Sequence, residues 1–414
     1  MTEKSTKPQL RFAGFDDTWE QRKLSDVATM HARIGWQNLR TSEFLDSGDY
    51  MLITGTDFND GAVNYSTCHF VEKERYEQDK HIQIKNGSIL ITKDGTLGKV
   101  AYVQGLSMPA TLNAGVFNVE IKDETKVDNK YLFQYLKAPF LMDYVDKKAT
   151  GGTIKHLNQN ILVDFPVVMP SKAEQEAIGV YFQQLDNLIT LHQRKYDKLT
   201  NVKKSMLEKM FPKNGSNVPE IRFKGFSDAW EQRKVGELLI ERNEQAPMNE
   251  EYPLMAFIAN EGVAPKGERY DRSSLVTDTE NKLYKRTEFG DFIYSSNNLE
   301  TGSIGLNKYG KACISPVYSV FHPTGIADSN FLGRRLVRKD FINSMVKWRQ
   351  GVIYGQWRIH ESDFLKIDIP VPSVEEQRQI GTFLGYLDNL ITLHQRELEK
   401  LKNLKKACLE KMFV

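Results

Sequence analysis

The stretch LDNLITLHQR occupies residues 185–194 and returns unchanged at residues 387–396. It belongs to a longer repeat, because residues 181–212 and 383–414 share 20 of 32 positions. A second repeat precedes each copy: RFAGFDDTWEQRK at residues 11–23 and RFKGFSDAWEQRK at residues 222–234 share 10 of 13 positions. Two long repeats, unlike a solenoid of many short ones, predict pseudo-twofold symmetry.

The two repeated segments together form a frame that occurs twice, and each copy of this frame encloses an insert. The two inserts can be aligned only over short segments. The first insert has 146 residues between Lys23 and Pro170, and the second has 137 between Lys234 and Pro372. A shared frame around unlike inserts predicts one scaffold that carries two different recognition domains.

The repeated C-terminal part of the frame predicts a long helix. Ser171 and Ser373 each follow a proline and precede a glutamate by three residues, which is the pattern of a capping box. Apolar residues then recur at alternating steps of four and three, as in a heptad seam. A helix over residues 172–210 would be roughly 58 Å long. The seam residues that the two copies share most clearly are Leu185, Ile189 and His192, and Leu387, Ile391 and His394.

Each insert combines short strand-like stretches with turns and helical segments. The predicted strands cover residues 50–54, 88–92, 99–103, 254–258, 291–294 and 317–321, and the predicted helical segments cover residues 129–146 and 340–349. The expected fold class is α/β, with two α/β recognition domains separated by two long, antiparallel, coiled-coil-like helices. The expected segments are residues 1–165, 166–213, 214–368 and 369–414, in which recognition domains alternate with spacer helices.

Composition describes a globular protein. Of the 414 residues, 40% are hydrophobic and 27% charged. There is no run of about 18 apolar residues to span a membrane. The N-terminal MTEKSTKPQL lacks the apolar core of a secretory signal, so a cytoplasmic location is expected. Three scattered cysteines without CxxC spacing argue against a zinc ribbon or a disulfide framework.

The net charge of +2 is weak support for nucleic-acid binding, but basic residues cluster late in each insert. Residues 331–358 carry seven arginines and lysines against Asp340 alone, and Lys147, Lys148 and Lys155 lie close together beside Asp146. Such clusters are typical of phosphate contact. The alternative for either cluster is a solvated helix face.

Several loops carry residues suited to contact DNA. Residues 93–99 combine two glycines with two lysines, and residues 295–303 occupy the corresponding place in the second insert. Residues 150–156 and 351–358 lie at equivalent places ahead of the repeated helix. Asparagine and glutamine can pair with adenine, and arginine and lysine with guanine. An ordinary turn is the alternative for each loop taken alone. The predicted DNA-binding residues are Lys93, Thr96, Lys99, Lys147, Lys148, Thr153 and Lys155 in the first insert, and Ser295, Asn297, Asn298, Arg349, Tyr354, Gln356 and Arg358 in the second.

Familiar catalytic motifs are missing from the sequence. The Gly95-x-x-Gly98-Lys99 stretch is too short for a Walker A loop, and the chain lacks His-Glu-x-x-His, Gly-x-Ser-x-Gly and a helix-opening Gly-x-Gly-x-x-Gly. It also lacks the Asn/Asp-Pro-Pro-Tyr/Phe loop of adenine methyltransferases. No catalytic residue and no metal site is therefore predicted. A non-catalytic recognition subunit is favoured over two alternatives, a non-DNA-binding oligomerisation scaffold or adaptor and a nuclease or methyltransferase with an unfamiliar site.

The arrangement resembles a known family. A bipartite duplication, an IPVPS-x-EEQ segment at residues 369–377 with a looser copy at residues 165–175, and a following helix with LDNLI resemble the DNA-specificity subunit of type I restriction-modification systems. The WEQRK segment ahead of each insert is also similar to that family. The resemblance covers essentially the whole chain.

The resemblance implies a function and a set of partners. Each insert would be a target recognition domain that reads one half of a bipartite site in double-stranded DNA, and the repeated helices would set the spacing and dock two methyltransferase subunits. Restriction subunits would join for cleavage. S-adenosylmethionine would be bound by the methyltransferase partner, and ATP and Mg²⁺ by the restriction partner, with no cofactor in this chain.

Overall fold

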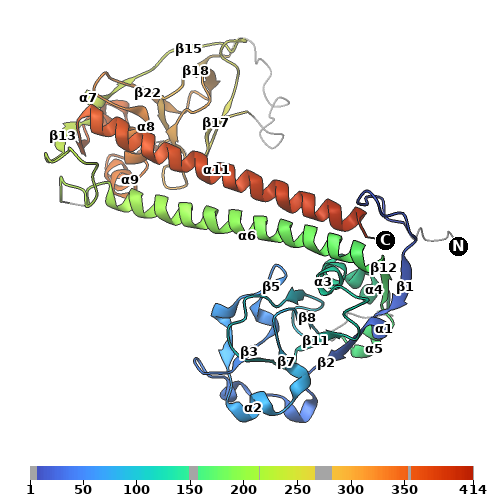
Figure 1. The fold of residues 1–414 in the computed structure, drawn as a ribbon. Coiled ribbons are helices and arrows are strands. Elements are labelled where there is room, and N and C mark those ends of the chain that lie inside the picture. The colour runs from blue at the N-terminus through green and yellow to red at the C-terminus, as the bar shows by residue number, and fades with distance from the viewer. Residues whose placement is uncertain (1–6, 149–156, 214, 266–281, 353–355, 414) are drawn as a thin grey trace. The chain divides into compact units, whose positions relative to one another are not determined.

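A computed structural model describes residues 7–148, 157–213, 215–265, 282–352 and 356–413 (Figure 1). The chain forms two compact units, one of residues 1–193 with 396–414 and one of residues 194–395. These units differ from the four predicted segments because each long helix contributes to both units. Each unit thus contains one insert together with parts of both repeated helices.

The first unit is mixed α/β, as predicted for an insert. Its strands are β1 (Glu20–Lys23), β2 (Ala28–His31), β3 (Met51–Ile53), β4 (Phe58–Asn59), β5 (Ala62–Val63), β6 (His69–Phe70), β7 (Gln83–Ile84), β8 (Ile89–Thr92), β9 (Val100–Tyr102), β10 (Ala110–Leu112), β11 (Val116–Ile121) and β12 (Pro166–Met169). Its short helices are α1 (Leu24–Val27), α2 (Lys73–Glu77), α3 (Asn129–Lys137), α4 (Phe140–Lys148) and α5 (Gln159–Val163), with 3₁₀ turns η1 (Gly35–Gln37), η2 (Thr41–Glu43), η3 (Gly55–Asp57), η4 (Tyr65–Thr67) and η5 (Lys80–Ile82).

The strands of the first unit form three sheets. One has the order β2-β11-β8-β9-β5-β4, a second has the order β6-β3-β10-β7, and β1 pairs with β12 alone. The β1–β12 ladder is antiparallel and joins the residues that flank the insert, with Lys23 opposite Pro166. The predicted helix over residues 129–146 is divided into α3 and α4, because Pro139 has no amide hydrogen to continue the helical ladder.

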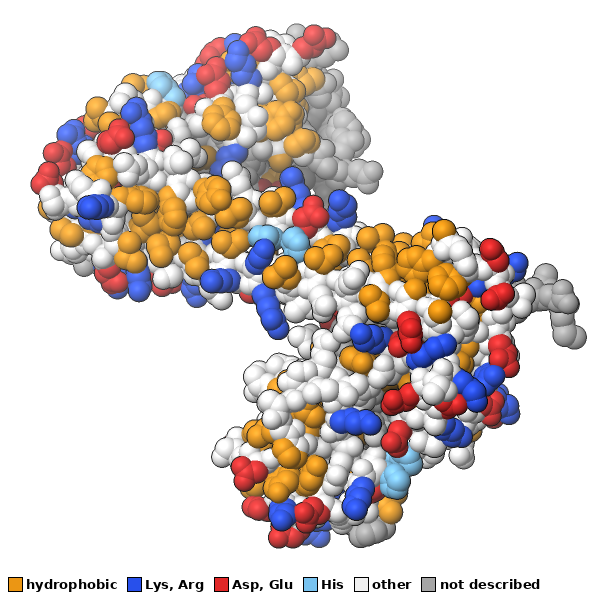
Figure 2. Space-filling model, in the orientation of Figure 1, with side chains coloured by type: hydrophobic (Ala, Val, Ile, Leu, Met, Phe, Trp, Pro, Cys, Tyr) orange, Lys and Arg blue, Asp and Glu red, His pale blue; other side chains and the backbone are white. Residues whose placement is uncertain are grey.

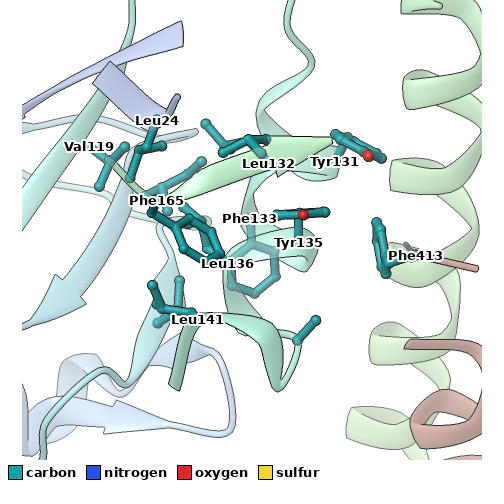
Figure 3. Packing of buried hydrophobic residues seen from close by; sticks show 14 of the residues in the cluster. Leu24, Val119, Tyr131, Leu132, Phe133, Tyr135, Leu136, Leu141, Phe165 and Phe413 are labelled. Carbon is teal, nitrogen blue, oxygen red and sulfur yellow. The ribbon is translucent and has the colours of Figure 1, made fainter. Parts of the chain in front are cut away.

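Helix α3 links the insert to the long helices of the first unit. Tyr131, Leu132, Phe133, Tyr135 and Leu136 of α3 are all buried in one cluster. Figure 3 shows these side chains between strand β11 and Phe413 near the C-terminus. The Phe413 ring lies 5.5 Å from each of the Tyr131 and Tyr135 rings, so the end of the second repeat completes the core of the first unit.

The second unit is also mixed α/β. Its strands are β13 (Glu231–Lys234), β14 (Leu239–Glu241), β15 (Gln245–Ala246), β16 (Ala256–Ile258), β17 (Gly262–Ala264), β18 (Tyr284–Thr287), β19 (Phe292–Tyr294), β20 (Ile304–Leu306), β21 (Ala312–Ile314), β22 (Ser319–Pro323), β23 (Gln350–Val352), β24 (Gln356–Arg358) and β25 (Asp368–Val371). Its short helices are α7 (Val235–Leu238), α8 (Ser329–Arg335), α9 (Lys339–Val346) and α10 (Glu361–Phe364).

The two inserts share a sheet order that their sequences hide. The order β14-β22-β19-β20 in the second unit repeats β2-β11-β8-β9 in the first, and β13–β25 repeats β1–β12. The hairpins β4–β5 and β16–β17 also correspond, as do α3 with α8 and α5 with α10. The unlike inserts are therefore variants of one fold.

The repeated helices are α6 (Lys172–Lys209) and α11 (Val374–Lys411), each of 38 residues. The predicted span of residues 172–210 is confirmed. The hydroxyl oxygens of Ser171 and Ser373 accept hydrogen bonds from the amides of Glu174 and Glu376, at 3.4 Å in both copies. The serine half of each predicted capping box is therefore present.

The predicted role of the glutamate in the capping box, to accept a hydrogen bond from the amide of the capping serine, is wrong. Glu174 is fully buried and accepts two hydrogen bonds from the Arg11 guanidinium, at 2.7 and 2.8 Å. Glu376 makes the same bidentate pair with Arg222, at 2.9 and 2.6 Å. A guanidinium offers two parallel donors to a carboxylate, whereas the cap offers a single amide, so the arginine is the stronger partner. Each pair ties the N-terminal repeat to the start of the long helix.

The glutamine that follows each glutamate fastens the helix to the insert. Gln175 accepts from the Asp128 amide at 2.9 Å and donates to the carbonyl oxygens of Lys126 at 3.1 Å and Pro170 at 2.9 Å. Gln377 makes the equivalent three bonds in the second unit. The EQ dipeptide is thus repeated because it fixes the insert on the helix.

Within the first unit, portions of α6 and α11 pack in antiparallel directions. Tyr181 contacts Cys408 at 3.6 Å, Phe182 stacks on Phe413 at 5.6 Å, and Asp186 pairs with Lys405. The second unit holds the counterpart of the last pair, in which Asp388 of α11 pairs with Lys203 of α6 at 2.5 Å. The aspartate of LDNLI therefore joins the two long helices in each unit.

Lys405 is nearly buried, and burial lowers its pKa to about 8, with a further lowering by nearby Lys137 and an opposing effect of Asp186. Between pH 8 and the unfolded value near 10.5, the unfolded chain binds the extra proton. The stability contribution of this site therefore rises with pH across that window, by at most about 1.4 kcal/mol per pH unit. We expect Lys405→Met to lose this rise in urea unfolding between pH 7.5 and 9.5.

The control is Lys402→Met, which removes an exposed lysine of the same helix. It should keep the pH dependence of the wild-type chain. Equal pH dependence in the Lys405→Met and wild-type chains would contradict the assignment.

In the described parts of the chain, no helix is both long and apolar enough to cross a membrane.

Candidate nucleic-acid interface

In the first unit the predicted glycine- and lysine-containing loop connects β8 to β9. Thr92 closes its base, because its Oγ1 donates to the Thr96 carbonyl oxygen and accepts from the Lys99 amide at 2.9 Å. Gly95 and Gly98 have φ angles of +74° and +70°, which favour glycine. Thr96 is exposed within this closed loop and Lys99 is exposed at its base, and Lys93 is half-buried with its ammonium 5.5 Å from the centre of the Phe117 ring.

Two other predicted segments meet this loop. A Cβ at Gly98 would lie 2.1 Å from Met142 Sδ, so the loop packs directly on α4. The Leu157 amide donates to the Lys93 carbonyl oxygen at 2.8 Å. Lys147 and Lys148 are exposed in the last turn of α4. The loop, helix α4 and Leu157 therefore lie together, whereas Thr153 and Lys155 fall outside the described residues.

The second unit has an equivalent loop between β19 and β20. Ser295 takes the place of Thr92 at its base, and its amide donates to the Ser303 carbonyl oxygen at 2.8 Å. Ser295 is buried at the base of the loop, and its predicted contact with DNA stays a prediction. Asn297 and Asn298 are exposed further along the loop.

The hairpin β23–β24 lies against this second loop. Asn297 Oδ1 accepts from the Trp357 amide at 2.6 Å, and Ser296 Oγ accepts from the Ile359 amide at 3.0 Å. Ile359 thereby occupies the place that Leu157 has in the first unit. Gln356 lies in β24 and Arg358 is exposed there, whereas Tyr354 falls outside the described residues.

The basic cluster of residues 331–358 is mostly directed into the fold. Arg334 pairs with Asp388 at 2.6 Å, Arg335 with Asp340 at 3.0 Å, and Arg338 with Asp340 at 3.4 Å. The Arg334 pair therefore joins α8 to α11, and the Arg335 pair joins α8 to α9. Three of the seven cations of the cluster thus face carboxylates of the chain itself.

Arg349 is also held by an internal partner. It makes a bidentate pair with Glu300 of the β19–β20 loop, at 2.7 and 2.6 Å, and this pair lowers the pKa of Glu300. The Arg349 side chain is 12% exposed, so the pair fixes the loop against the segment before β23. The cluster residues that remain exposed are Lys339, Lys347 and Arg358.

Two tryptophans near this interface are not among the DNA-binding residues predicted from the sequence. Trp348 and Trp357 are 40% and 49% exposed, although tryptophan usually loses most of its surface on folding. Aromatic rings on a DNA-facing surface can stack on bases or wedge between them. For Trp357, the signal available in the sequence was a tryptophan between Gln356 and Arg358 in a segment with two glycines, GVIYGQWR.

The predicted seam residues are divided between the two units. Leu185 and Ile189 are buried in the first unit and Leu387 in the second, as expected for a seam. Ile391, His192 and His394 are half-buried. Leu191 and Leu393, which directly precede the two histidines at repeated positions, are 46% and 52% exposed. Figure 2 shows hydrophobic side chains along the surface of the long helices.

Comparisons with known proteins agree with this geometry. The family described as type I restriction modification DNA specificity domain matches residues 16–201 and 227–403, once in each repeat. A Methanocaldococcus jannaschii protein assigned as the MjaX type I restriction enzyme specificity subunit is 24% identical over 94% of this chain and 91% of its own length. The MjaIX specificity subunit of the same organism is 21% identical over 95% of this chain and 92% of its own length.

A solved structure shows the same fold. The type I restriction-modification S subunit of M. genitalium aligns with a TM-score of 0.62 and 16% identity, covering 99% of both chains. The family matches cover most of the chain and divide it as the internal repeat does. The chain belongs to the family of type I restriction-modification DNA specificity proteins.

Proposed function

We propose that this chain is the DNA sequence-recognition subunit of a type I restriction-modification complex, in which each insert reads one half of a bipartite site. The observation that carries the proposal is the pair of equivalent interfaces. The β8–β9 loop with Leu157, and the β19–β20 loop with Ile359, occupy the same place in one fold but differ in sequence. Equivalent scaffolds with different exposed residues suit the recognition of two different half-site sequences, each called a word below.

Cations and loop side chains have different roles in the recognition of DNA. Exposed cations such as Lys99, Lys147 and Arg358 supply phosphate contacts, which position the duplex without reading its sequence. Asn297, Asn298 and Thr96 present groups that can bond base edges. Each mismatched base pair typically costs ~1–3 kcal/mol, roughly additively, so two words together give a sharp site.

We further propose that the long helices set the unread gap between the two words. Each helix of 38 residues is about 57 Å long at 1.5 Å per residue. The seam ion pairs, Asp186 with Lys405 and Asp388 with Lys203, fix the register of the two helices in each unit. A fixed register gives a fixed spacing.

Two methyltransferase subunits and the restriction subunits are the proposed protein partners. Leu191 and Leu393 are large apolar side chains, repeated and about half exposed, which is typical of a surface that another protein covers. Two equivalent surfaces suit two copies of one partner. S-adenosylmethionine then belongs to the methyltransferase, and ATP and Mg²⁺ to the restriction subunit. This chain supplies no catalytic group, and the partner flips the target adenine.

Leu191→Asp and Leu393→Asp test the docking surface. A buried apolar contact at an interface centre is worth at least about 2 kcal/mol, so each change should weaken methyltransferase binding roughly thirtyfold at one of the two sites. Calorimetric titration of the methyltransferase into each variant measures the affinity and the number of sites. The matched control is Thr190→Asp, an exposed polar neighbour that should change neither value. Unchanged binding in both leucine variants would contradict the assignment.

Lys99→Ala tests the interface of the first unit. Loss of one phosphate contact should weaken the assembled complex similarly on all DNA sequences, and it should reduce the slope of log K against log salt by about 0.9. Fluorescence anisotropy over a salt series measures both quantities. Lys73→Ala is the control, because Lys73 pairs with Glu77 in α2, away from the loop (Figure 1). Binding without sequence preference in the wild-type complex would contradict the recognition role, and no binding of DNA at all would favour the scaffold alternative.

A further inference from the structure

Outside the proposed DNA interface, three side chains that commonly bind metals converge in the first unit. His31 lies at the end of β2, Glu120 lies on β11, and His81 lies in the 3₁₀ turn η5. Each offers one ligand atom, and these three atoms all lie within 4.8 Å of one another. The three residues are far apart in sequence, so no spacing motif could reveal them.

The sheet places His31 and Glu120 on one face. Strands β2 and β11 are antiparallel, with His31 opposite Asn118 and Thr29 opposite Glu120. Residues directly opposite one another, and residues two positions further along, project from the same face. His31 and Glu120 are therefore diagonal neighbours, and His31 Nε2 lies 3.8 Å from Glu120 Oε2.

Hydrogen bonds to the backbone hold His81 over this pair. Asn118 Nδ2 donates to the His81 carbonyl oxygen at 3.0 Å, and the Asp79 carboxylate accepts from the His81 amide at 2.9 Å. The rings of His31 and His81 are stacked, with centroids 4.5 Å apart and planes at 19°. Two strands and one anchored turn thus fix the backbone positions from which all three side chains converge.

We propose that His31, His81 and Glu120 bind a divalent transition-metal ion, with Zn²⁺ the first choice and Ni²⁺ or Co²⁺ as substitutes. Imidazole nitrogens suit these ions, whereas Mg²⁺ and Ca²⁺ prefer oxygen ligands alone. Metal–nitrogen bonds of about 2.0–2.1 Å require the three ligand atoms to move closer together. The exposed side chains of His81 and Glu120 have room to do so. Water can complete the coordination.

The ion would crosslink the two large sheets of the first unit. His31 and Glu120 belong to the six-stranded sheet, whereas His81 lies in η5, which immediately precedes β7 of the four-stranded sheet. A ligand that binds the folded state alone raises its apparent stability. Metal binding should therefore stabilise the insert without touching DNA.

Isothermal titration calorimetry with the full-length chain, first treated with EDTA and then dialysed, tests the proposal. We expect ZnSO₄ to bind one site and to raise the unfolding temperature, and MgCl₂ to do neither. His81→Ala should weaken Zn²⁺ binding by more than about tenfold and abolish the thermal shift, and Glu120→Gln should weaken binding by a smaller factor. His81 and Glu120 are exposed, so neither change threatens folding.

The matched control is His360→Ala, an exposed histidine of the second unit, which should leave Zn²⁺ binding unchanged. Three outcomes would overturn the proposal. These are no heat of binding in the wild-type chain, equal affinity in the wild-type and His81→Ala chains, and equal loss in His81→Ala and His360→Ala, which would show adventitious binding only.

Discussion

Replacing Arg11 by methionine is expected to lower the free energy of unfolding by about 3–5 kcal/mol, the usual cost of leaving a buried charge without its partner. Glu174 is fully buried, and both of its carboxylate oxygens accept from the Arg11 guanidinium. Methionine keeps much of the side-chain volume but provides no donor. The N-terminal repeat should therefore detach from the start of α6, and urea unfolding measured at pH 7 should show the loss.

Two further variants separate this explanation from a general sensitivity to arginine loss. Arg22→Met removes an exposed pair with Glu20 and should cost no more than about 1 kcal/mol. In Arg11→Met combined with Glu174→Met, the buried charge is gone, and most of the lost stability should return. Arg222 and Glu376 repeat the pair in the second unit and provide an independent replicate. A small loss in Arg11→Met, or no recovery in the double variant, would contradict the role of the pair.

Exchanging residues 24–165 for the insert of another family member is expected to change one half of the recognised site and to leave the other half and the gap unaltered. The β1–β12 ladder lies just outside both junctions, with Lys23 opposite Pro166, so the exchange preserves the frame. The long helices are also unchanged. With a cost of ~1–3 kcal/mol per mismatched base pair, the original first word should lose all methylation.

Mapping methylated sequences in cells that carry the exchanged chain and its methyltransferase measures this result. The reciprocal exchange of residues 235–367, which lies between β13 and β25, is the control and should alter only the other word. A change in both words after a single exchange would show that the inserts do not read independently. A changed gap would show that the helices do not set the spacing.

The repeat and its long helix could be read from the sequence because both depend on local pattern. Heptad spacing and a serine after proline place the helix over residues 172–210, and α6 ends within one residue of that span. The partner of Glu174 could not be read in this way, because Arg11 lies 163 positions away. Only the presence of both residues in both repeats hinted at a pair.

The common fold of the inserts was hidden because a fold tolerates exchange of side chains that fill the same space. Asp128 and Asp328 cap α3 and α8 in the same way, yet Phe133 of α3 corresponds to Gly333 of α8. Phe133 is buried against Tyr102 of β9, whereas Gly333 packs on Leu306 in β20, where an added Cβ would lie 2.4 Å from the Leu306 side chain. Such replacements erase sequence similarity while β2-β11-β8-β9 and β14-β22-β19-β20 keep one order.

The number of arginines and lysines in residues 331–358 predicted the candidate interface only in part. Arg334, Arg335 and Arg349 lie within the basic cluster, but their partners are Asp388, Asp340 and Glu300. Two of these acids belong to other parts of the chain, and only the fold brings them close. A local count of cations therefore overestimates the charge that a protein presents to DNA.

The most direct test of the central claim is a complete base-substitution scan across the methylated site, with methylation by the assembled wild-type complex as the readout. Two separate blocks of base pairs should be intolerant of substitution, each mismatch costing ~1–3 kcal/mol, with a block of tolerated positions between them. One continuous intolerant block, or tolerance at every position, would contradict recognition of two words by two inserts.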